Sequence, residues 1–377
     1  MTLTIGIDLG ATYSRVAVWH DNRVEVIPNN NASRATPSIV AFAGTRQLIG
    51  DSALSQIDAN PSNTITNAKR QLATNALLHA EFNDNIHTFA AHDVTAAILR
   101  ALREAAEAYL GACARDAVIT VPACFSRAQC RDTQKAAQIA GLNVLQIIRD
   151  PVATAMALGH DAYGGQTVML VDMGGGSLDA SVLKFNSTNS SFNVLATAGN
   201  SHLGGIDFDN LLLAHILATA TTNPLPPSHA IHRLRIACER AKRTLSTATI
   251  ATVEIDNSSV VHVTRPVFED LCATLFDQVL DTVKKTLAIA GLHRNKINSV
   301  VLVGGSTRIP KLRQMVAGYF GNKPLCTPSD CHDETVVIGA ATHAASLSTA
   351  TTTNSTAIVP LKDLILSANH TLVTKCH

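Results

Sequence analysis

Two stretches that lie far apart in the chain share one pattern of apolar and polar positions. Residues 4–18 contain an apolar strand, an Asp, a Gly-containing turn with hydroxyl side chains, and a second strand of alternating character. Residues 167–183 repeat this order. Alternation with a period of two is typical of β-strands, and a Gly-rich turn between two such strands predicts a β-hairpin. The repetition predicts two related lobes that face each other.

Between and after these hairpins, a period near 3.6 predicts helices. Asp93 is the expected N-cap of one helix, and Asp150 is the expected N-cap of another, with Pro151 in its first position. Continuous apolar runs at 116–121 and 299–303 predict strands that helices cover on both faces of a sheet. The alternation of such strands with helices predicts an α/β fold.

Polar segments separate or follow these elements. We expect a surface loop over residues 218–230 and a flexible linker beyond Ser346, where Thr, Ser and Asn dominate. A short apolar segment at 361–367 precedes a polar end.

Composition and charge exclude several classes of protein. The 377 residues suggest two or three domains, and 16% charged residues is too few for a coiled coil or a charge-rich disordered chain. A net charge of +1 gives no electrostatic reason to expect nucleic-acid or membrane binding. The sequence has no apolar run long enough for a membrane helix and no basic region at its N-terminus. We therefore expect a soluble, cytoplasmic protein.

The eight Cys residues do not form a CxxC pair or the density of a disulfide scaffold. The nearest approach to a metal-binding pattern is Cys326, Cys331 and His332. Because no second pair of ligands accompanies them, we do not expect a zinc site.

The two hairpin turns are suited to a polyphosphate. Gly-rich turns cluster backbone N–H groups, and an Asp at the end of each neighbouring strand can hold Mg²⁺ through its waters, because this ion dehydrates reluctantly. Asp8 and Asp172 occupy these positions and are expected to face each other across a cleft. The sequence contains no GxxxxGKS/T motif and no GxGxxG motif that opens a helix after a strand, which disfavours P-loop and Rossmann chemistry.

A third Gly-rich turn, Gly304 to Arg308, follows the strand at 299–303 and opens a helix. It is either an ordinary strand-to-helix turn or a surface on which a base or ribose packs. Spacing places four polar residues on one face of a helix around 231–246. They are Glu239, Lys242, Arg243 and Ser246. From spacing alone this face is either part of a binding site or solvated, with a Glu239–Arg243 pair.

Several segments together resemble one known family. They are IGIDLGATYSRVAVW, VDMGGGSLDASVLKF, HLGGIDFDN, RIACERAKRTLS, VVLVGGSTRIPKL and DETVVIGAA. In this order, between residue 4 and about residue 346, they resemble the ATPase domain of the 70-kDa heat-shock chaperone family. The resemblance implies an actin-like fold, in which two lobes enclose an ATP cleft and each lobe has a duplicated RNase H-like core and an outer subdomain.

The resemblance also implies a division of the chain. Lobe I would span residues 1–163, with its outer part at about 38–92, and a returning helix at 334–347 would complete it. Lobe II would span 164–333, with its outer part at about 206–272. Residues 348–377 would form a linker-like tail, without the peptide-binding domain of the family.

Roles follow from the resemblance for individual residues. Asp8 and Asp172 would hold hydrated Mg²⁺, Asp179 would support the attacking water, and Lys69 would position that water and stabilise charge on the γ-phosphate. Asp150 stands where the family has a catalytic Glu. The phosphates would be wrapped by Gly10, Ala11, Thr12, Tyr13, Gly174, Gly175, Gly176 and Ser177. Adenosine would be surrounded by Glu239, Lys242, Arg243, Ser246, Gly305, Ser306, Thr307, Arg308 and Asp333.

Departures from the family pattern bear on the rate of hydrolysis and on coupling to partners. Ala11 replaces a Thr near the γ-phosphate, and Asp150 shortens a carboxylate arm by one methylene. Ile206 replaces an acidic residue. Cys130 and Gln146 replace two Arg residues that help to transmit J-domain binding in the family. Neither the Cys thiol nor the Gln amide can make the bidentate, charge-assisted bonds of a guanidinium.

Two functions therefore stay open. The first is slow, Mg-dependent hydrolysis of ATP by a chaperone of this family; the second is a nucleotide-responsive regulatory module with little or no turnover. The expected ligands are ATP or ADP with Mg²⁺. The expected partners are J-domain co-chaperones and nucleotide-exchange factors, with doubtful coupling and with no direct site for a peptide client.

Overall fold

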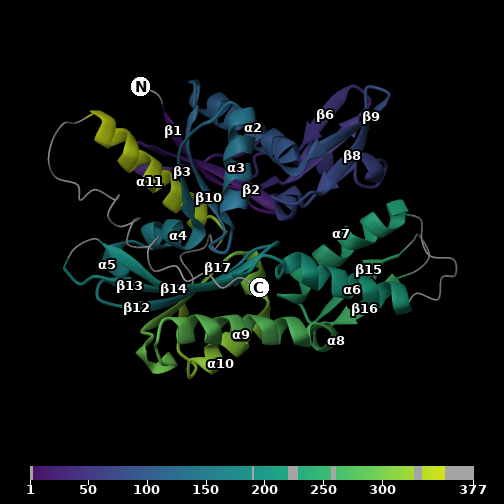
Figure 1. Cartoon of the computed structure of the whole chain (residues 1–377). Helices are drawn as coiled ribbons and strands as arrows, with labels where there is room; N and C mark the ends of the chain where they lie inside the picture. Colours follow the sequence, from purple (N-terminus) through teal and green to yellow (C-terminus); the bar gives the residue numbers. More distant parts are fainter. Residues whose placement is uncertain (1–2, 189–190, 220–227, 256–259, 327–332, 353–377) are drawn as a thin grey trace.

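The structure is a computed structural model that describes residues 3–188, 191–219, 228–255, 260–326 and 333–352. Two large sheets dominate it, each with helices packed against it (Figure 1). We call the six-stranded sheet and the elements on it the first lobe, and the five-stranded sheet and the elements on it the second lobe.

The N-terminal hairpin lies at the centre of the six-stranded sheet. Strand β1 pairs antiparallel with β2, and β10 joins the other edge of β1 in parallel, giving the order β11-β10-β1-β2-β3 with β4 beside β2. The strands are β1 (Thr4–Asp8), β2 (Tyr13–His20), β3 (Arg23–Val26), β4 (Thr36–Pro37), β10 (Asp116–Val121) and β11 (Asn143–Arg149).

The second sheet repeats this connectivity. Its order is β14-β13-β12-β17-β18, with an antiparallel meander of three strands followed by two parallel strands. The strands are β12 (Thr167–Met173), β13 (Leu178–Phe185), β14 (Phe192–Asn200), β17 (Ser299–Val303) and β18 (Leu325–Cys326). The predicted hairpins, the predicted strands at 116–121 and 299–303, and the α/β class are all confirmed.

Smaller sheets and helices extend each lobe on one side of Figure 1. In the first lobe these are β5 (Ile39–Ala43), β6 (Arg46–Ile49), β7 (Thr64–Thr66), β8 (Leu77–Phe82) and β9 (Asn85–Ala90), with the short helices α1 (Asp51–Leu54), η1 (Pro61–Asn63) and η2 (Ala68–Gln71). In the second lobe they are α6 (Gly205–Thr219), α7 (Ser228–Leu245), α8 (Arg265–Leu271), β15 (Ile250–Glu254) and β16 (Val260–Thr264). These extensions form the walls of the site described below.

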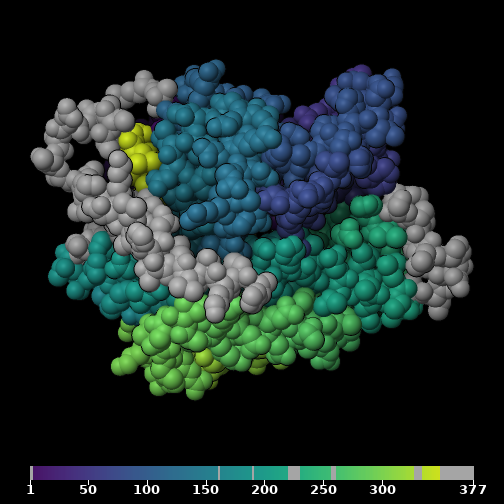
Figure 2. All heavy atoms as spheres, in the orientation of Figure 1, coloured from purple at the N-terminus to yellow at the C-terminus, as the bar shows by residue number. Residues whose placement is uncertain are grey.

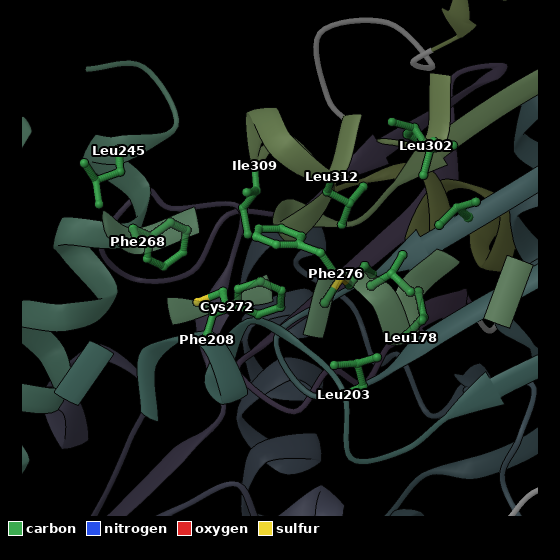
Figure 3. Packing of buried hydrophobic residues seen from close by; sticks show 14 of the residues in the cluster. Leu178, Leu203, Phe208, Leu245, Phe268, Cys272, Phe276, Leu302, Ile309 and Leu312 are labelled. Carbon is green, nitrogen blue, oxygen red and sulfur yellow. The ribbon is translucent and has the colours of Figure 1, made fainter. Parts of the chain in front are cut away.

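Further helices cover the sheets. They are α2 (Ala91–Leu110), α3 (Arg127–Ile139), α4 (Asp150–Leu158), α5 (His160–Tyr163), α9 (Ala273–Ile289), α10 (Pro310–Tyr319) and α11 (Thr335–Thr352), with the single turns η3 (Arg294–Lys296) and η4 (Gly305–Arg308). Apolar residues of α2 and α3 pack on β1 and β2. The second lobe has its own core, in which Phe208, Phe268 and Phe276 meet residues from β13, β17 and α10 (Figure 3).

Helix α11 returns to the first lobe and lies against β1, β2 and α4. The contact is so close that two positions have no room for a side chain. A Cβ on Gly6 would lie 2.2 Å from the backbone nitrogen of Ala341, and one on Gly339 would lie 1.8 Å from the carbonyl oxygen of Ala153. A third core that includes Val118, Val168 and Ala340 joins the two sheets beneath this helix.

Some predicted boundaries are wrong by a few residues. Ala90 is the N-cap of α2, and Asp93 is the third residue of the helix, whose carboxylate accepts a 2.9 Å hydrogen bond from the Ala90 N–H. Arg149 is the N-cap of α4, because β11 runs directly into it in an extended conformation. Asp150 is therefore the first helical residue, and the side chain of the N-cap Arg149 makes no capping hydrogen bond.

The predicted linker beyond Ser346 is also partly wrong, because α11 continues to Thr352, five residues past the expected end of the returning helix. The predicted loop at 218–230 overlaps the ends of α6 and α7, and its central part, 220–227, lies outside the described residues. The apolar segment at 361–367 lies outside them as well. Among the described helices, none is long and apolar enough to span a bilayer.

Candidate functional site

A cavity of about 1150 Å³ lies between the two lobes. Figure 2 shows the hollow between the purple and blue residues of the first lobe and the green residues of the second. Nearly every site residue predicted from the sequence lines this cavity. They are Asp8, Gly10, Ala11, Thr12, Tyr13, Lys69, Asp150, Asp172, Gly174, Gly175, Gly176, Ser177, Glu239, Lys242, Arg243, Ser246, Gly305, Ser306, Arg308 and Asp333.

Two predicted site residues, Asp179 and Thr307, do not line the cavity. Thr307 is fully buried, and its hydroxyl donates a 2.7 Å hydrogen bond to the carbonyl of Gly304, so it closes the turn of η4. Asp179 lies beneath the floor, where its carboxylate accepts a 3.1 Å hydrogen bond from the Ala123 N–H of the first lobe. Asp179 therefore joins the lobes and lies close to the site without facing its open space.

The two hairpin turns meet each other across the cavity. A Cβ on Gly175 would lie 1.9 Å from the Thr12 hydroxyl oxygen, and one on Gly176 would lie 2.3 Å from the Ala11 Cβ. The Thr12 hydroxyl oxygen is buried and has no hydrogen-bond partner among the described residues. Backbone groups of both turns therefore line one small space, which is the arrangement that phosphate oxygens require.

Three carboxylates, those of Asp8, Asp150 and Asp172, line the inner end of the cavity, and that of Asp179 lies beneath them. Burial raises the pKa of Asp8, Asp150 and Asp172. Repulsion from Asp150 adds to the rise at Asp8 and Asp172, whereas at Asp150 itself the charge of Lys69 lowers the pKa and repulsion from Asp179 raises it. Burial also raises the pKa of Asp179 to about 6, although hydrogen bonds from Ala123 and Cys124 oppose the rise. Such a cluster favours a bound cation, since a cation stabilises the ionised form of each carboxylate.

Lys69 supplies a positive charge to this cluster. It lies in the single turn η2, after a left-handed Asn67, and its ammonium donates to the Leu9 carbonyl and lies 5.4 Å from the centre of the Phe125 ring. Its charge lowers the pKa of Asp8 and Asp150. The ammonium is thus fixed beside the first hairpin turn.

The other end of the cavity lies between α7 and η4. Glu239 and Arg243 form an ion pair at 3.5 Å on the open face of α7, and Ser246 follows the last residue of the helix. Lys242 is different, because its buried ammonium bonds the Asp209 carboxylate at 2.8 Å and the Gly205 carbonyl at 2.9 Å. Its position in the wall therefore serves the packing of α7 on α6.

Arg308 and Asp333 lie at the same end and form an ion pair at 3.1 Å. The other oxygen of Asp333 is buried without a hydrogen-bond partner among the described residues. Ser306 donates a 2.8 Å hydrogen bond to the Gly174 carbonyl, which ties η4 to the second hairpin turn. The turn at 304–308 is therefore part of the cavity wall, and the packing of a base or ribose on it stays a prediction.

Sequence reasoning missed three arginines that line the cavity, Arg15, Arg70 and Arg313. Arg15 pairs with Asp8 in the register of β1 and β2, so both side chains point to the same face, and its guanidinium lies 4.0 Å from Asp8 and 3.7 Å from Asp333. Arg70 crosses to the second lobe and contacts Asp207. The register of the predicted hairpin could have revealed Arg15, because it pairs this residue with Asp8. For Arg70, the only signal in the sequence is its position next to Lys69.

Comparison with known proteins decides the family. The family model described as "Hsp70 protein" matches residues 4–372. The chain belongs to the Hsp70 family. Among curated Hsp70 relatives, it is 40% identical to heat shock 70 kDa protein 2 of Paracoccidioides lutzii, over 97% of this chain and 60% of that protein. It is 41% identical to heat shock cognate 70 kDa protein 3 of Dictyostelium discoideum, over 92% of this chain and 60% of that protein.

The Hsp70 assignment agrees with the architecture. Two lobes with the same sheet connectivity and a deep cavity between them form the actin-like fold of the Hsp70 ATPase domain. The chain spans about 60% of the length of the curated Hsp70 proteins that it matches. The match therefore concerns the part of an Hsp70 that contains this cavity.

Proposed function

We propose that this chain acts as the nucleotide-binding domain of an Hsp70-type chaperone, binding ATP or ADP with Mg²⁺ between the lobes and hydrolysing ATP slowly. One observation carries the proposal: two Gly-rich turns, each preceded by a partly buried Asp, meet across one cavity beside Lys69. Phosphates fit the turns, and adenosine fits the end between α7 and η4.

Mg²⁺ fits the inner end of the cavity, because several carboxylates lie close together there and their pKa values are raised in spite of Lys69 and Arg15. Asp8 and Asp172 would hold the ion. Among the described residues, no three His, Cys, Asp or Glu side chains converge to ligate one ion directly. Because Mg²⁺ dehydrates reluctantly, we expect it to be held mainly through waters. When bound, the ion neutralises charge that develops on the phosphate oxygens.

The chain's own groups divide the remaining work. Lys69 stabilises the charge on the γ-phosphoryl group as a water oxygen attacks its phosphorus and the bond to the bridging oxygen breaks. Asp179, whose carboxylate the Ala123 N–H holds beneath the cavity, would support that water from below rather than from the open space. Asp150, the first residue of α4, lines the cavity, and the charge of Lys69 opposes the rise in its pKa that burial causes.

The second candidate function is a regulatory module that holds nucleotide with little turnover. The observation that favours it is the side chain of Asp150, which is one methylene shorter than the Glu of the family. Helix α4 cannot shift to make up this length, because Pro151 and the close contact with α11 hold it in place. Single-turnover hydrolysis of bound ATP separates the two candidates. Conversion of ATP at a measurable rate supports the ATPase, and retention of intact ATP supports the module.

Saturating Mg-ATP is expected to stabilise the folded protein. A ligand that binds only the native state adds RT ln(1 + [L]/Kd), or about 2.7 kcal/mol at a hundredfold excess over Kd, so the melting temperature rises by several degrees. The shift is measured by differential scanning fluorimetry, with ATP plus EDTA as the control for the metal. A melting curve that Mg-ATP leaves unmoved contradicts the nucleotide assignment.

Coupling to J-domain proteins is expected to be weak. Gln146 accepts a 2.7 Å hydrogen bond from the buried ring of His343 on α11, and Cys130 packs against an apolar cluster that includes Phe125. Burial lowers the pKa of His343 to about 4, so this contact is neutral. Neither position offers the charge-assisted contacts of a guanidinium.

An excess of J-domain protein should therefore accelerate single-turnover hydrolysis less than about tenfold, which is a barrier change below roughly 1.4 kcal/mol. The matched variant carries Cys130→Arg and Gln146→Arg together and should respond more strongly. Stimulation of the unmodified chain far above tenfold would show that other residues provide the coupling.

A further inference from the structure

The HLGGIDFDN segment contains two aspartates that the proposed function leaves without a role. Asp209 is buried and bonds Lys242 within the second lobe. Asp207 lies in the first turn of α6 and points the other way, toward the first lobe. The two carboxylates therefore belong to different contacts, and only that of Asp207 joins the lobes.

The partner of Asp207 is Arg70, which uses each of its nitrogens. Its Nη2 donates to one carboxylate oxygen of Asp207 at 2.7 Å, its Nη1 donates to the other at 3.2 Å, and its Nε donates to the Gly176 carbonyl at 2.9 Å. The exposed fractions of the two side chains are 16% and 20%. A bidentate, largely buried pair of this kind is directional and strong compared with an exposed ion pair.

Asp207 is also held by contacts within its own lobe. The Gly204 N–H donates a 2.7 Å hydrogen bond to the same oxygen that meets Arg70 Nη2, and the carboxylate lies at the positive end of the fifteen-residue helix α6. The carbonyls of Gly174 and Gly175 accept from the N–H groups of residues 205 and 206. Asp207 and the second hairpin turn, which we also call the second phosphate turn, therefore form one rigid unit.

Arg70 belongs to the opposite unit. It follows Lys69 directly in η2, where the Lys69 ammonium bonds the Leu9 carbonyl at the first hairpin turn. One turn of backbone thus presents Lys69 to the carboxylates and Arg70 to Gly176 and Asp207. Any separation of the lobes at this point must break three hydrogen bonds of Arg70.

We propose that Arg70 is a positioning residue that, through Asp207, holds the second phosphate turn at its working distance from Lys69 and slows the release of nucleotide. The inference rests on the proposed nucleotide site. Arg70 acts through Lys69 and the turn, so its loss should lower the rate of the chemical step more than it lowers ATP affinity at equilibrium. Loss of Arg70 should also speed dissociation of ADP, because the lobes can then separate without breaking its hydrogen bonds to Asp207 and Gly176.

The test uses Arg70→Met, Asp207→Asn, the double variant, and the exchanged pair Arg70→Asp with Asp207→Arg, in the full chain. The matched control is Arg294→Met, which removes an arginine bonded to the Tyr319 carbonyl away from the cavity. For each variant, single-turnover hydrolysis, the Kd for ATP and the dissociation rate of fluorescently labelled ADP are measured. Circular dichroism checks that each variant is folded.

The expected result is a fall of about tenfold or more in the single-turnover rate and a comparable rise in ADP dissociation for Arg70→Met. The Kd for ATP should change less than the rate. Asp207→Asn should resemble it, the double variant should add little, and the exchanged pair should recover part of the loss. Because Asn has the same size and shape as Asp, the Asp207→Asn variant is used for the test if Arg70→Met does not fold.

Single variants with unchanged ADP dissociation overturn the inference while leaving the nucleotide site intact. Effects of the two single variants that simply add in the double variant overturn it as well, because independent sites add. If the unmodified chain binds ADP but hydrolyses no ATP, the dissociation measurement decides the matter. Failure of the unmodified chain to bind any nucleotide overturns the proposed function and this inference together.

Discussion

Replacement of Lys69 by alanine is expected to slow single-turnover hydrolysis of bound ATP by about 10²- to 10³-fold, which is the usual cost of losing one fixed donor to transition-state charge. The Kd for ATP should stay within a few-fold, because the ammonium is needed most when the γ-phosphoryl group separates. The rate is measured by quenched-flow analysis of preformed complex, and the Kd by calorimetry.

Lys323→Ala is the matched control for this experiment. Lys323 also donates its ammonium to a backbone carbonyl, that of Ile297, but it does not line the cavity. Its loss should leave hydrolysis unchanged. If Lys69→Ala lowered affinity and rate by the same factor, Lys69 would be a contact of the bound ground state, and its proposed catalytic role would be wrong.

Gly339→Ala is expected to destabilise the fold by about 2–3 kcal/mol, although alanine favours a helix more than glycine does. The added Cβ would lie 1.8 Å from the Ala153 carbonyl oxygen, so α11 would have to move away from α4, and overpacking of this kind costs more than the helical preference returns. Urea denaturation followed by circular dichroism measures the loss as a lower midpoint.

The matched variant is Gly318→Ala in α10, where an added Cβ meets no atom within 4 Å. It should stabilise the protein by about 0.8–1 kcal/mol, as expected for this change within a helix. If Gly339→Ala were as stable as the unmodified chain, α11 would not lie as close to α4 as described here.

The hairpins and the phosphate turns could be predicted because their signals are local. An apolar strand, an Asp and a Gly-rich turn lie within a few residues, so Asp8 and Asp172 could be placed at strand ends from sequence alone. The cap of α4 was placed one residue late, because Asp150 before Pro151 fits both the N-cap and the first helical position, and only the extended β11 distinguishes them.

Contacts between distant parts of the chain could not be predicted in this way. Arg70 and Asp207 are separated by 137 residues, and no local pattern at either one indicates the other. Lys242 has the spacing of a ligand-binding residue on one face of α7, yet its ammonium is occupied by Asp209. Helical spacing shows which residues share a face, whereas the neighbouring helix decides what that face contacts.

The return of α11 to the first sheet has a consequence for the newly made chain. Strands β1 and β2 leave the ribosome well before α11, because Val337 and Ala341, which cover Ala17 and Val26, are made more than 300 residues later. At about 5–20 residues per second, that delay is roughly 15–60 s. For this time one apolar face of the N-terminal sheet has no native cover, so the first lobe can finish folding only when nearly all of the second has been synthesised.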